Sequence, residues 1–409
     1  MRRRGMRILF ATTRAAGHFG PLIPFAHACR RAGHDVIVAA AGSLAPHVER
    51  AGLPHAALRD PSLEALEPIW QRVRRMEPRD ANRVMMREVF AGEHAGAALP
   101  GMLATMRAWQ PDVVLRESCE FASLVAAERL GIPHVHVGIF LATGSVLEWE
   151  PLVDPLERLR ARAGLGPDPR PERLWDEPYL TLTPRSLEDP GDIPPAGTRR
   201  FHDPAAPAQP LPDWWGASDD PLVYVSFGSV AAGAGFFPGL YRAAVDELAD
   251  LPIRVLLTVG TDADPAELGP VPASVRVERW VPQSAVTPHA AAMVGHGGSG
   301  STLMAMAAGV PVALIPLFAD QPVNARRVAA LGAGIALGPV AEGGDVTTLI
   351  AGTATDGIPA LRGAVETLLH EPGHRMAARR VAAEIAALPP VDAVPELLAD
   401  LARDTALAA

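Results

Sequence analysis

The sequence contains no lysine, and all 37 of its basic residues are arginines. Without a lysine amine the chain cannot perform Schiff-base or pyridoxal-phosphate catalysis, and it lacks the lysine that P-loop enzymes and kinases place on phosphates. A GC-rich codon bias, which also fits the 37 glycines and 41 prolines, accounts for this composition. Several classes of nucleotide-binding protein are therefore excluded.

Cysteines and long apolar runs are also scarce. Cys29 and Cys119 have neither metal-ligand spacing nor the number needed for a disulfide framework, so we expect reduced core thiols in a cytoplasmic protein. The longest charge-free run, Val281 to Ala319, is interrupted by glycine, serine, proline and histidine. This run therefore lacks the uninterrupted apolar segment that a bilayer span requires, and we expect no such span. No signal peptide is expected, because Arg14 follows the first apolar run closely. We predict no stable association with a membrane.

The balance of charge is acidic, with a formal net charge of -9. Binding to nucleic acid draws mainly on surplus cationic side chains, so we expect no nucleic-acid partner. The 409 residues suit two domains of about 200 residues each, and 48% hydrophobic with 20% charged residues is typical of a globular protein.

Strand and helix patterns alternate along both halves of the chain. This βαβ rhythm predicts α/β domains with parallel sheets. Residues 184–221 are rich in proline and predict a linker between two such domains. In the first half the expected strands are residues 8–12, 36–40, 113–115 and 134–138, and the expected helices 21–32, 44–51 and 119–130; the second half begins with strands 222–226 and 253–259 around a helix at 240–248, and the chain ends in a helical pattern at 391–407.

The most informative segment runs from Trp280 to Asn324. A short strand near residues 292–294 leads into Gly297, Gly298 and Gly300, after which residues 301–309 have the composition of a helix. Free N–H groups and the positive end of the helix dipole would meet there, together with Ser299, Ser301 and His296. This is a suitable cradle for a diphosphate.

Residues on either side of this turn complete a nucleotide-sugar site. Trp280 can stack on a base, and Gln283 can hydrogen-bond the base or its ribose. Asp320 and Gln321 follow a second predicted strand, residues 310–315, and can bind sugar hydroxyls.

These residues carry a family resemblance. WVPQ, HGGSGST and the ADQPVN ending resemble the donor signature of family-1 glycosyltransferases with the GT-B fold, most closely the bacterial enzymes that glycosylate natural products. RILFATTRAAGHFGPLIPFAHACRRAGHDV is similar to the family's first strand, catalytic loop and first helix. The resemblance implies two doubly wound Rossmann-like α/β domains facing a cleft. Their expected boundaries are an acceptor-binding domain 1–200, a linker 201–220, a nucleotide-sugar-binding domain 221–390 and a C-terminal helix 391–409 that crosses back to the first domain.

His18 is the expected catalytic base. It follows the first strand in the sequence GHFGP, so it lies at the carboxyl edge of the sheet, where α/β proteins bind ligands, and it matches the family's GHxxP loop. A carboxylate that orients the ring improves such a base. Glu117 stands where the family's dyad acid falls, although the family more often has aspartate there. Glu120 is the alternative partner.

The resemblance adds further site residues. Ser229, in the SFGS turn, is expected at the phosphates, and Val281 beside Trp280 is expected in the donor site. Met304 replaces a ribose-binding glutamate of plant relatives, which favours dTDP over UDP as the nucleotide. No metal site and no cofactor are expected, because no DxD pair follows a strand. The expected lining of an apolar acceptor pocket is Trp70, Met86, Phe90 and Phe140, for which a plain core role is the alternative.

The sequence therefore predicts an inverting, metal-independent glycosyltransferase that moves a deoxysugar from a nucleoside diphosphate to a hydroxyl of an apolar aglycone in antibiotic biosynthesis. Its partners are then the nucleotide-sugar donor and a small apolar acceptor, and a homodimer is left open. A GT-B sugar-nucleotide epimerase or cell-wall transferase is one alternative. A non-catalytic activating partner of the same fold is another, which the intact His18 and donor motif oppose.

Overall fold

The structure is a computed structural model, which describes residues 5–141, 150–168, 170, 174, 177–204, 211–214, 218–261, 263–339, 348, 358 and 360–408. Residues 205–210 and 215–217 of the expected linker 201–220 lie outside this set. The chain forms two compact units. The first comprises Met1–Leu182, Asp192–Asp203 and Pro389–Ala409, and the second Thr183–Gly191 and Pro204–Leu388.

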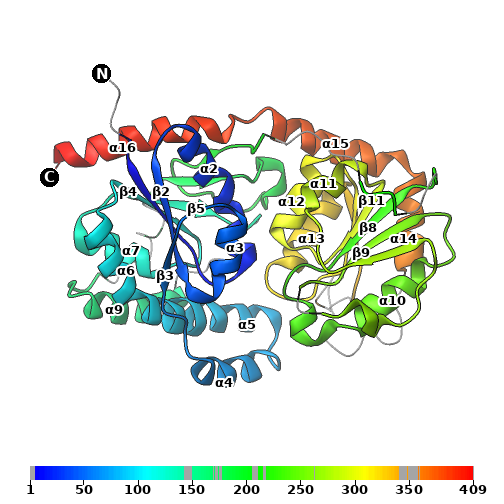
Figure 1. The fold of residues 1–409 in the computed structure, drawn as a ribbon, viewed down its shortest axis with the longest axis horizontal. Helices are drawn as coiled ribbons and strands as arrows, with labels where there is room; N and C mark the ends of the chain where they lie inside the picture. Colours follow the sequence, from blue (N-terminus) through cyan, green and yellow to red (C-terminus); the bar gives the residue numbers. More distant parts are fainter. Residues whose placement is uncertain are drawn as a thin grey trace. The chain divides into compact units, whose positions relative to one another are not determined.

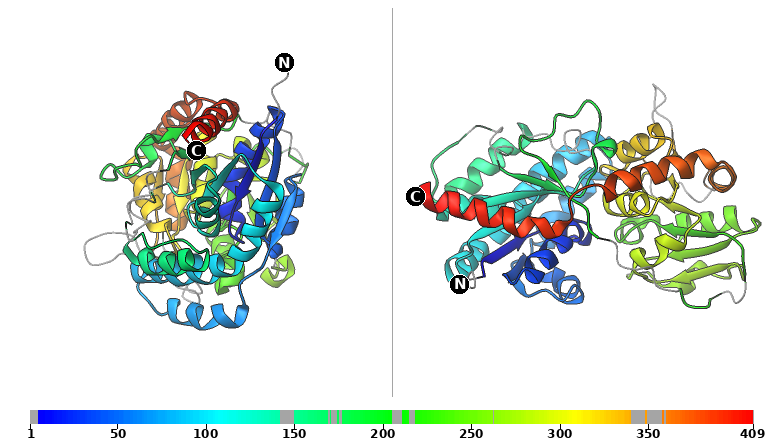
Figure 2. Two further views of the ribbon diagram at one scale, coloured as in Figure 1. Left: turned by 90° about the vertical axis from the view of Figure 1, so that its left-hand side faces the viewer. Right: turned by 90° about the horizontal axis from the view of Figure 1, so that it is seen from above.

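The first unit is built on a seven-stranded parallel sheet with the order β3-β2-β1-β4-β5-β6-β7 (Figure 1). Helices cover both faces of this sheet (Figure 2). The strands are β1 Arg7–Ala11, β2 Asp35–Ala41, β3 His55–Leu58, β4 Val113–Glu117, β5 His134–Gly138, β6 Tyr179–Thr181 and β7 Arg199–Arg200; the helices of four residues or more are α1 Ala16–Phe19, α2 Ile23–Arg31, α3 Ala45–Arg50, α4 Leu63–Val73, α5 Pro78–Val84, α6 Ala95–Trp109, α7 Ala122–Leu130, α9 Val153–Arg162 and α16 Val394–Ala408, with a π-helix η3 Met85–His94.

Strand β1 shows why this sheet is buried on both faces. Ile8 and Phe10 join one hydrophobic cluster, and Leu9 and Ala11 join the cluster on the opposite face. Successive side chains of a strand point to opposite faces, so a continuous apolar run is what a two-sided sheet requires.

The second unit has a six-stranded parallel sheet with the order β10-β9-β8-β11-β12-β13. The prediction of two doubly wound α/β domains is confirmed. The strands are β8 Leu222–Ser226, β9 Arg254–Thr258, β10 Val275–Glu278, β11 Ala292–Gly295, β12 Val312–Leu314 and β13 Gly334–Ala336; the helices are α10 Gly239–Leu248, α11 Gln283–Val286, α12 Ser299–Ala307, α13 Gln321–Ala330, α14 Leu361–His370 and α15 Pro372–Ala386, with a π-helix η7 Ala232–Phe236.

The C-terminal helix α16 belongs to the first unit. Val391, Val394 and Leu398 are buried in the same cluster as Phe25 of α2. An ion pair of 2.8 Å between Arg31 and Asp392 lies beside this contact. The apolar stripe of α16 therefore completes the core on this face of the sheet.

The chain passes from one unit to the other at four positions, after Leu182, Gly191, Asp203 and Leu388. Ser186 belongs to the second unit because its carbonyl accepts hydrogen bonds from Arg327 at 2.6 and 2.8 Å. The chain then returns to the first unit, where Arg199–Arg200 form edge strand β7 and Phe201 enters the core. A two-residue strand carries too little periodicity to be recognised in a sequence.

Residues 60–100, whose pattern breaks the alternation, form a helical segment without a strand. Helices α5, η3 and α6 follow one another directly, and α4 packs against η3 through Leu66, Ile69 and Val89. The wide turns of the π-helix η3 carry Phe90 and His94. Such π-helical turns occur frequently at functional sites.

Candidate active site

Both groups of predicted site residues lie at topological switch points of their sheets. In the first unit β1 lies between β2 and β4, so the chain connections diverge there; His18 follows β1, and Glu117 ends β4. In the second unit β8 lies between β9 and β11, and the glycine turn follows β11. Ligands of α/β sheets bind at the carboxyl ends of the strands that flank such a point.

His18 and Glu117 form a hydrogen-bonded pair. Nδ1 of His18 lies 3.1 Å from Oε1 of Glu117, and the side chains are 18% and 0% exposed. The backbone N–H groups of Thr13 and Cys119 donate to the same carboxylate at 3.2 and 2.6 Å. Glutamate is longer than the aspartate that the family more often has at this position, and here its side chain reaches His18 within ordinary hydrogen-bond distance.

The carboxylate of Glu117 is kept ionised. Burial by itself raises its pKa, but the charge and hydrogen bond of His18 and the N–H groups of Cys119 and Thr13 together hold the pKa below its usual value. An ionised carboxylate only accepts hydrogen bonds, so Nδ1 of His18 carries the proton and Nε2 is the basic atom.

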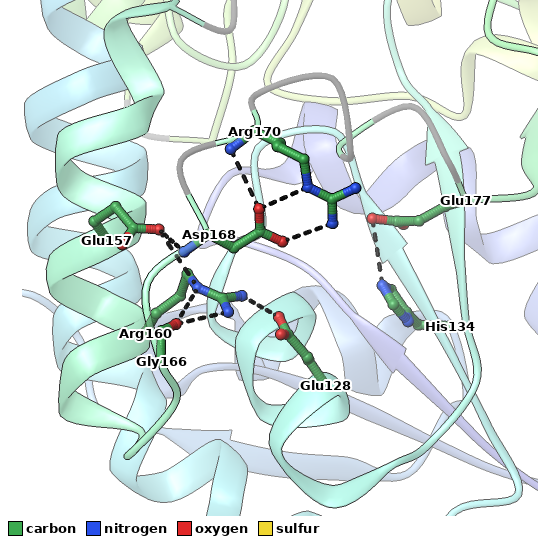
Figure 3. A network of polar contacts seen from close by, with 8 residues as sticks. All are labelled: Glu128, His134, Glu157, Arg160, Gly166, Asp168, Arg170 and Glu177. Carbon is green, nitrogen blue, oxygen red and sulfur yellow. Dashed lines mark hydrogen bonds and ion pairs between the residues drawn. The ribbon is translucent and has the colours of Figure 1, made fainter. Parts of the chain in front are cut away.

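A buried ion pair holds Arg116, at the end of β4, in place. Arg116, which precedes Glu117, donates to Glu177 at 2.9 and 3.1 Å, and both side chains are almost fully buried. His134 lies 3.4 Å from the same carboxylate (Figure 3). Although burial opposes it, Arg116 and His134 hold the pKa of Glu177 well below the usual range.

A second part of the same network holds the chain after α9. Arg160 donates to Glu128 at 2.5 Å and to the carbonyl of Gly166 at 2.8 Å, and Glu157 accepts from the backbone N–H of Asp168 at 2.9 Å (Figure 3). These contacts join α9 and the chain that follows it to α7, which contains Glu128.

Glu120, the alternative partner of His18, is used differently. Its carboxylate accepts hydrogen bonds from the backbone N–H groups of Ala122 and Ser123 and from the Ser123 hydroxyl, at the start of α7. Burial raises the pKa of Glu120 to about 6, although Ser123 opposes this shift. The structure brings Glu117, and not Glu120, to His18.

A cavity opens beside the pair in the first unit. It measures about 320 Å³, including open space at its mouth, and its wall includes Thr12, Thr13, Phe90, His94, Cys119 and Glu120. The ring of Phe90, which lines the cavity, lies 5.2 Å from the ring of His18. Burial and the nearby charges of Arg14 and His18 lower the pKa of His94 to about 4.

The other expected acceptor residues take different positions. Met86 is buried, with its sulfur 3.8 Å from Sγ of Cys119. Trp70 packs in the cluster of α4 and η3, with the guanidinium of Arg14 5.8 Å from its ring centre. Phe140 packs partly buried against the core. None of these three is part of the described cavity wall, whereas Phe90 is.

The glycine turn of the second unit leads directly into helix α12. Gly298 is the N-cap and Ser299 the first residue of this nine-residue helix, which has no acidic residue in its first turn. Gly297 has φ +85°, and a Cβ atom there would lie 3.1 Å from the carbonyl oxygen of Gln321. The turn therefore requires glycine, and the exposed Gly300 leaves the helix start open.

Asn324, the last residue of the ADQPVN motif, for which the sequence analysis gave no role, holds this turn together. The residue is fully buried, and its Nδ2 donates to Gly297 O, Asp320 Oδ2 and Ser299 Oγ at 2.8, 2.8 and 3.2 Å. Ser299 also donates to Asp320 Oδ2 at 2.6 Å. The i, i+4 spacing of Asp320 and Asn324 on α13 is the signal that could have revealed it.

The side chains of Gln321 and Gln283 form hydrogen bonds with different kinds of partner, backbone N–H groups for Gln321 and serine hydroxyls for Gln283. Oε1 of Gln321 accepts from the backbone N–H groups of Leu317 and Phe318 at 2.7 and 3.0 Å, so this side chain shapes the loop before α13. Gln283 accepts from Ser301 at 3.1 Å and donates to Ser226 at 3.4 Å. The expected base and phosphate elements are thus joined in one polar chain.

Trp280 and Ser229 are the exposed members of the group. Trp280 is 53% exposed, and Val281 beside it is half-buried. Ser229 is exposed after β8, next to Gly228, which has φ +79°. An indole is an amphipathic ring with a large apolar face.

His296 is buried and neutral. Only 9% of it is exposed, and burial lowers its pKa to about 4, against an opposing hydrogen bond with the backbone of Ser226. Its Nδ1 has no hydrogen-bond partner. The residue can therefore offer a hydrogen bond near the turn, but not a charge.

Within the described parts of the chain, three side chains meet the spacing of a metal site: the ligand atoms of His18, Glu117 and Cys119 lie within 4.8 Å of one another. His18 and Glu117 already bond each other there. Neither cysteine forms a disulfide, and both are buried. No described helix combines the length and apolarity that crossing a bilayer requires.

Comparison with known proteins agrees with this geometry. Residues 27–149 and 242–401 match the N- and C-terminal domains of the erythromycin biosynthesis protein CIII-like family. The L-demethylnoviosyl transferase of Streptomyces niveus is 32% identical over 400 residues, which cover 96% of this chain and 98% of that protein.

Two crystal structures show the same architecture. The glycosyltransferase SnogD of Streptomyces nogalater has 29% identity and a TM-score of 0.73, covering 98% of this chain and 100% of SnogD. SsfS6 of Streptomyces sp. SF2575, complexed with thymidine diphosphate, has 27% identity and a TM-score of 0.73, covering 97% and 99%. The chain therefore belongs to the erythromycin biosynthesis protein CIII-like family of natural-product glycosyltransferases with the GT-B fold, and it is a glycosyltransferase.

Proposed function

We propose that this enzyme transfers a deoxysugar from a thymidine diphosphate donor to a hydroxyl of an apolar natural-product aglycone, with inversion at the anomeric carbon and without a metal ion. The observation that carries the proposal is the His18–Glu117 pair, with Glu117 fully buried and the ring of His18 5.2 Å from that of Phe90 in a cavity wall of the first unit. A biosynthetic role in antibiotic production is supported by the transferases that the chain resembles.

His18 acts as general base in this proposal. Nε2 takes the proton of the acceptor hydroxyl while the acceptor oxygen forms a bond to the anomeric carbon and the sugar–phosphate bond breaks. The diphosphate departs with the electron pair. Glu117 stabilises the imidazolium that forms, and a single displacement with one base inverts the anomeric centre.

The glycine turn receives the diphosphate. N–H groups of the first turn of α12 and the positive end of its dipole oppose the phosphate charge, and Ser299 and Ser301 stand in the same turn. Because His296 is neutral, it contributes a hydrogen bond. These groups can stabilise the leaving group without a cation.

Thymidine as the base is supported by SsfS6, which binds thymidine diphosphate, and by Met304, which cannot accept hydrogen bonds from a ribose with any strength. Trp280 is the proposed stacking surface for the base, with Val281 beside it, and Gln283 the proposed polar contact. Asp320 and Gln321 are proposed at the sugar and Ser229 at the phosphates.

Nucleotide binding and sugar transfer are tested separately. Thermal shifts with thymidine, uridine, adenosine and guanosine diphosphates should single out thymidine diphosphate, since a ligand at about 100 times its Kd stabilises by about 2.7 kcal/mol. Transfer is followed by mass spectrometry with TDP-deoxysugars and oxygenated aromatic aglycones, with and without EDTA. NMR of the product gives the anomeric configuration.

The variant His18→Ala should abolish transfer and leave the thymidine diphosphate shift unchanged. His370→Ala, at an exposed position at the end of α14, is the matched control and should retain activity. Full transfer by His18→Ala, retention of configuration, or loss of activity in EDTA would each contradict part of the proposal.

A further inference from the structure

Two hydroxyl groups in the cavity of the first unit have no hydrogen-bond partner. Oγ1 of Thr12 and Oγ1 of Thr13 are buried and unsatisfied, and the residues are only 2% and 6% exposed. Both belong to the cavity wall. Buried polar groups are nearly always hydrogen-bonded, so two adjacent exceptions in residues that line one cavity indicate a ligand that supplies the missing partners.

The backbone N–H groups of both threonines are hydrogen-bonded, in contrast to their hydroxyl groups. Thr12 N–H donates to Ala39 O at 3.2 Å, and Thr13 N–H donates to Oε1 of Glu117 at 3.2 Å. The two residues are therefore fixed in place after β1. Through its N–H group Thr13 holds the carboxylate that bonds His18, so the subsite and the base share a partner in Glu117.

The charges around the cavity restrict what can bind at its polar end. Glu120, 4% exposed, is the buried acid of the wall, and Arg59 is an exposed cation of the same wall. His94, 9% exposed, is neutral at pH 7 because burial lowers its pKa to about 4. A carboxylate group beside Glu120 would be repelled, whereas a neutral oxygen would not.

We propose that Thr12 and Thr13 form a hydrogen-bonding subsite for a neutral oxygen of the acceptor, a ketone or a second hydroxyl, distinct from the hydroxyl that receives the sugar. The inference rests on the proposed function and narrows its acceptor class. The substrate is then an oxygenated cyclic aglycone whose two oxygens lie on one ring system: one bonds the threonines, and the other is presented to His18. The ring between them contacts Phe90.

Binding without donor tests this subsite independently of sugar transfer. The probes are 2,7-dihydroxynaphthalene and 2-naphthol, which differ by one hydroxyl, titrated into the full-length protein by calorimetry. We expect the diol to bind wild type about tenfold more tightly than the mono-ol. Thr12→Val and Thr13→Val keep the β-branched shape. Each should weaken the binding of the diol about three- to tenfold and leave the affinity for 2-naphthol unchanged.

Two controls separate hydroxyl loss from a packing change. Thr12→Ser and Thr13→Ser keep the hydroxyl and should retain the preference for the diol. Tyr241→Phe removes another buried hydroxyl without a partner, in the core of the second unit, and should bind both probes as wild type does. The valine variants should also melt no lower than wild type, because they remove an unsatisfied group.

The outcomes distinguish this inference from the proposed function. Equal binding of the two probes, or an unchanged diol affinity in the double variant Thr12→Val/Thr13→Val, overturns the subsite and leaves the transferase proposal standing. If neither probe binds wild type, the cavity does not take oxygenated aromatic rings and the inference fails. Transfer assays with His18→Ala are independent of all these results.

Discussion

The ring of His296 occupies the space in which a side chain at position 298 would lie. A Cβ atom on Gly298 would meet Nε2 of His296 at 2.4 Å, which no real structure tolerates without displacement. Gly298 has φ -62° and ψ 140°, an ordinary extended conformation. The need for glycine at this position is therefore steric and not conformational.

Gly298→Ala should displace the His296 ring and weaken thymidine diphosphate binding at least tenfold, with a loss of about 1–3 kcal/mol in stability from overpacking. Calorimetric titration and urea unfolding measure the two effects. Gly363→Ala is the matched control, since its new Cβ meets nothing within 4 Å in helix α14. It should bind the nucleotide normally and gain up to about 1 kcal/mol. Normal binding by Gly298→Ala would remove His296 from the proposed donor site.

Glu117→Gln should lower kcat by about 10²–10⁴ while the Kd for thymidine diphosphate stays unchanged, because the neutral amide no longer stabilises the imidazolium of His18. Its NH₂ group would also face the N–H groups of Thr13 or Cys119, which now donate to the carboxylate. Glu157→Gln, in the structural network of Figure 3, should keep wild-type kcat. Equal rates for the two variants would mean that Glu117 does not serve the base.

The central strands of both sheets could be predicted because their apolar runs are short and bounded by turn residues, whereas β3, β6, β7, β10 and β13 are not among the expected strands. The expected strand 222–226 coincides with β8, and the expected strand 36–40 lies within β2. The expected helix 21–32 is divided into a 3-10 turn at Gly20–Leu22 and α2, with Pro21 and Pro24 each in a first turn. Proline fits the first turn of a helix but cannot extend one, which explains the division.

The polar contacts of the sites could not be predicted in the same way. The sequence leaves Glu117 and Glu120 as alternatives, and only the fold brings one of them to 3.1 Å from His18. His94 belongs to no motif, and its place in the cavity wall depends on a π-helix that periodicity does not reveal. Long-range contacts of this kind are fixed by tertiary packing and leave no local signal.

Asn324→Asp should destabilise the second unit by about 2–4 kcal/mol at pH 7.5, because the new carboxylate would replace the amide that now donates to Asp320 at 2.8 Å. One of the two acids then has a raised folded pKa, so the lost stability returns as the pH falls and the pair takes up a proton. Urea unfolding at pH 5 and 7.5 measures this. Asn82→Asp, at the only other asparagine of the sequence, is the control and should show little change at either pH.

Glu120→Gln should change how stability depends on pH. Burial raises the pKa of Glu120 from 4.5 to about 6, so the folded protein binds the proton more tightly than the unfolded chain does. This contribution is fully present below pH 4.5 and is lost as the pH rises to 6, by about 2 kcal/mol. The unfolding free energy of wild type should therefore fall relative to that of Glu120→Gln across this window. Parallel curves from pH 4.5 to 7 would show that the carboxyl group titrates normally, and that the N–H groups of Ala122 and Ser123 fully offset its burial.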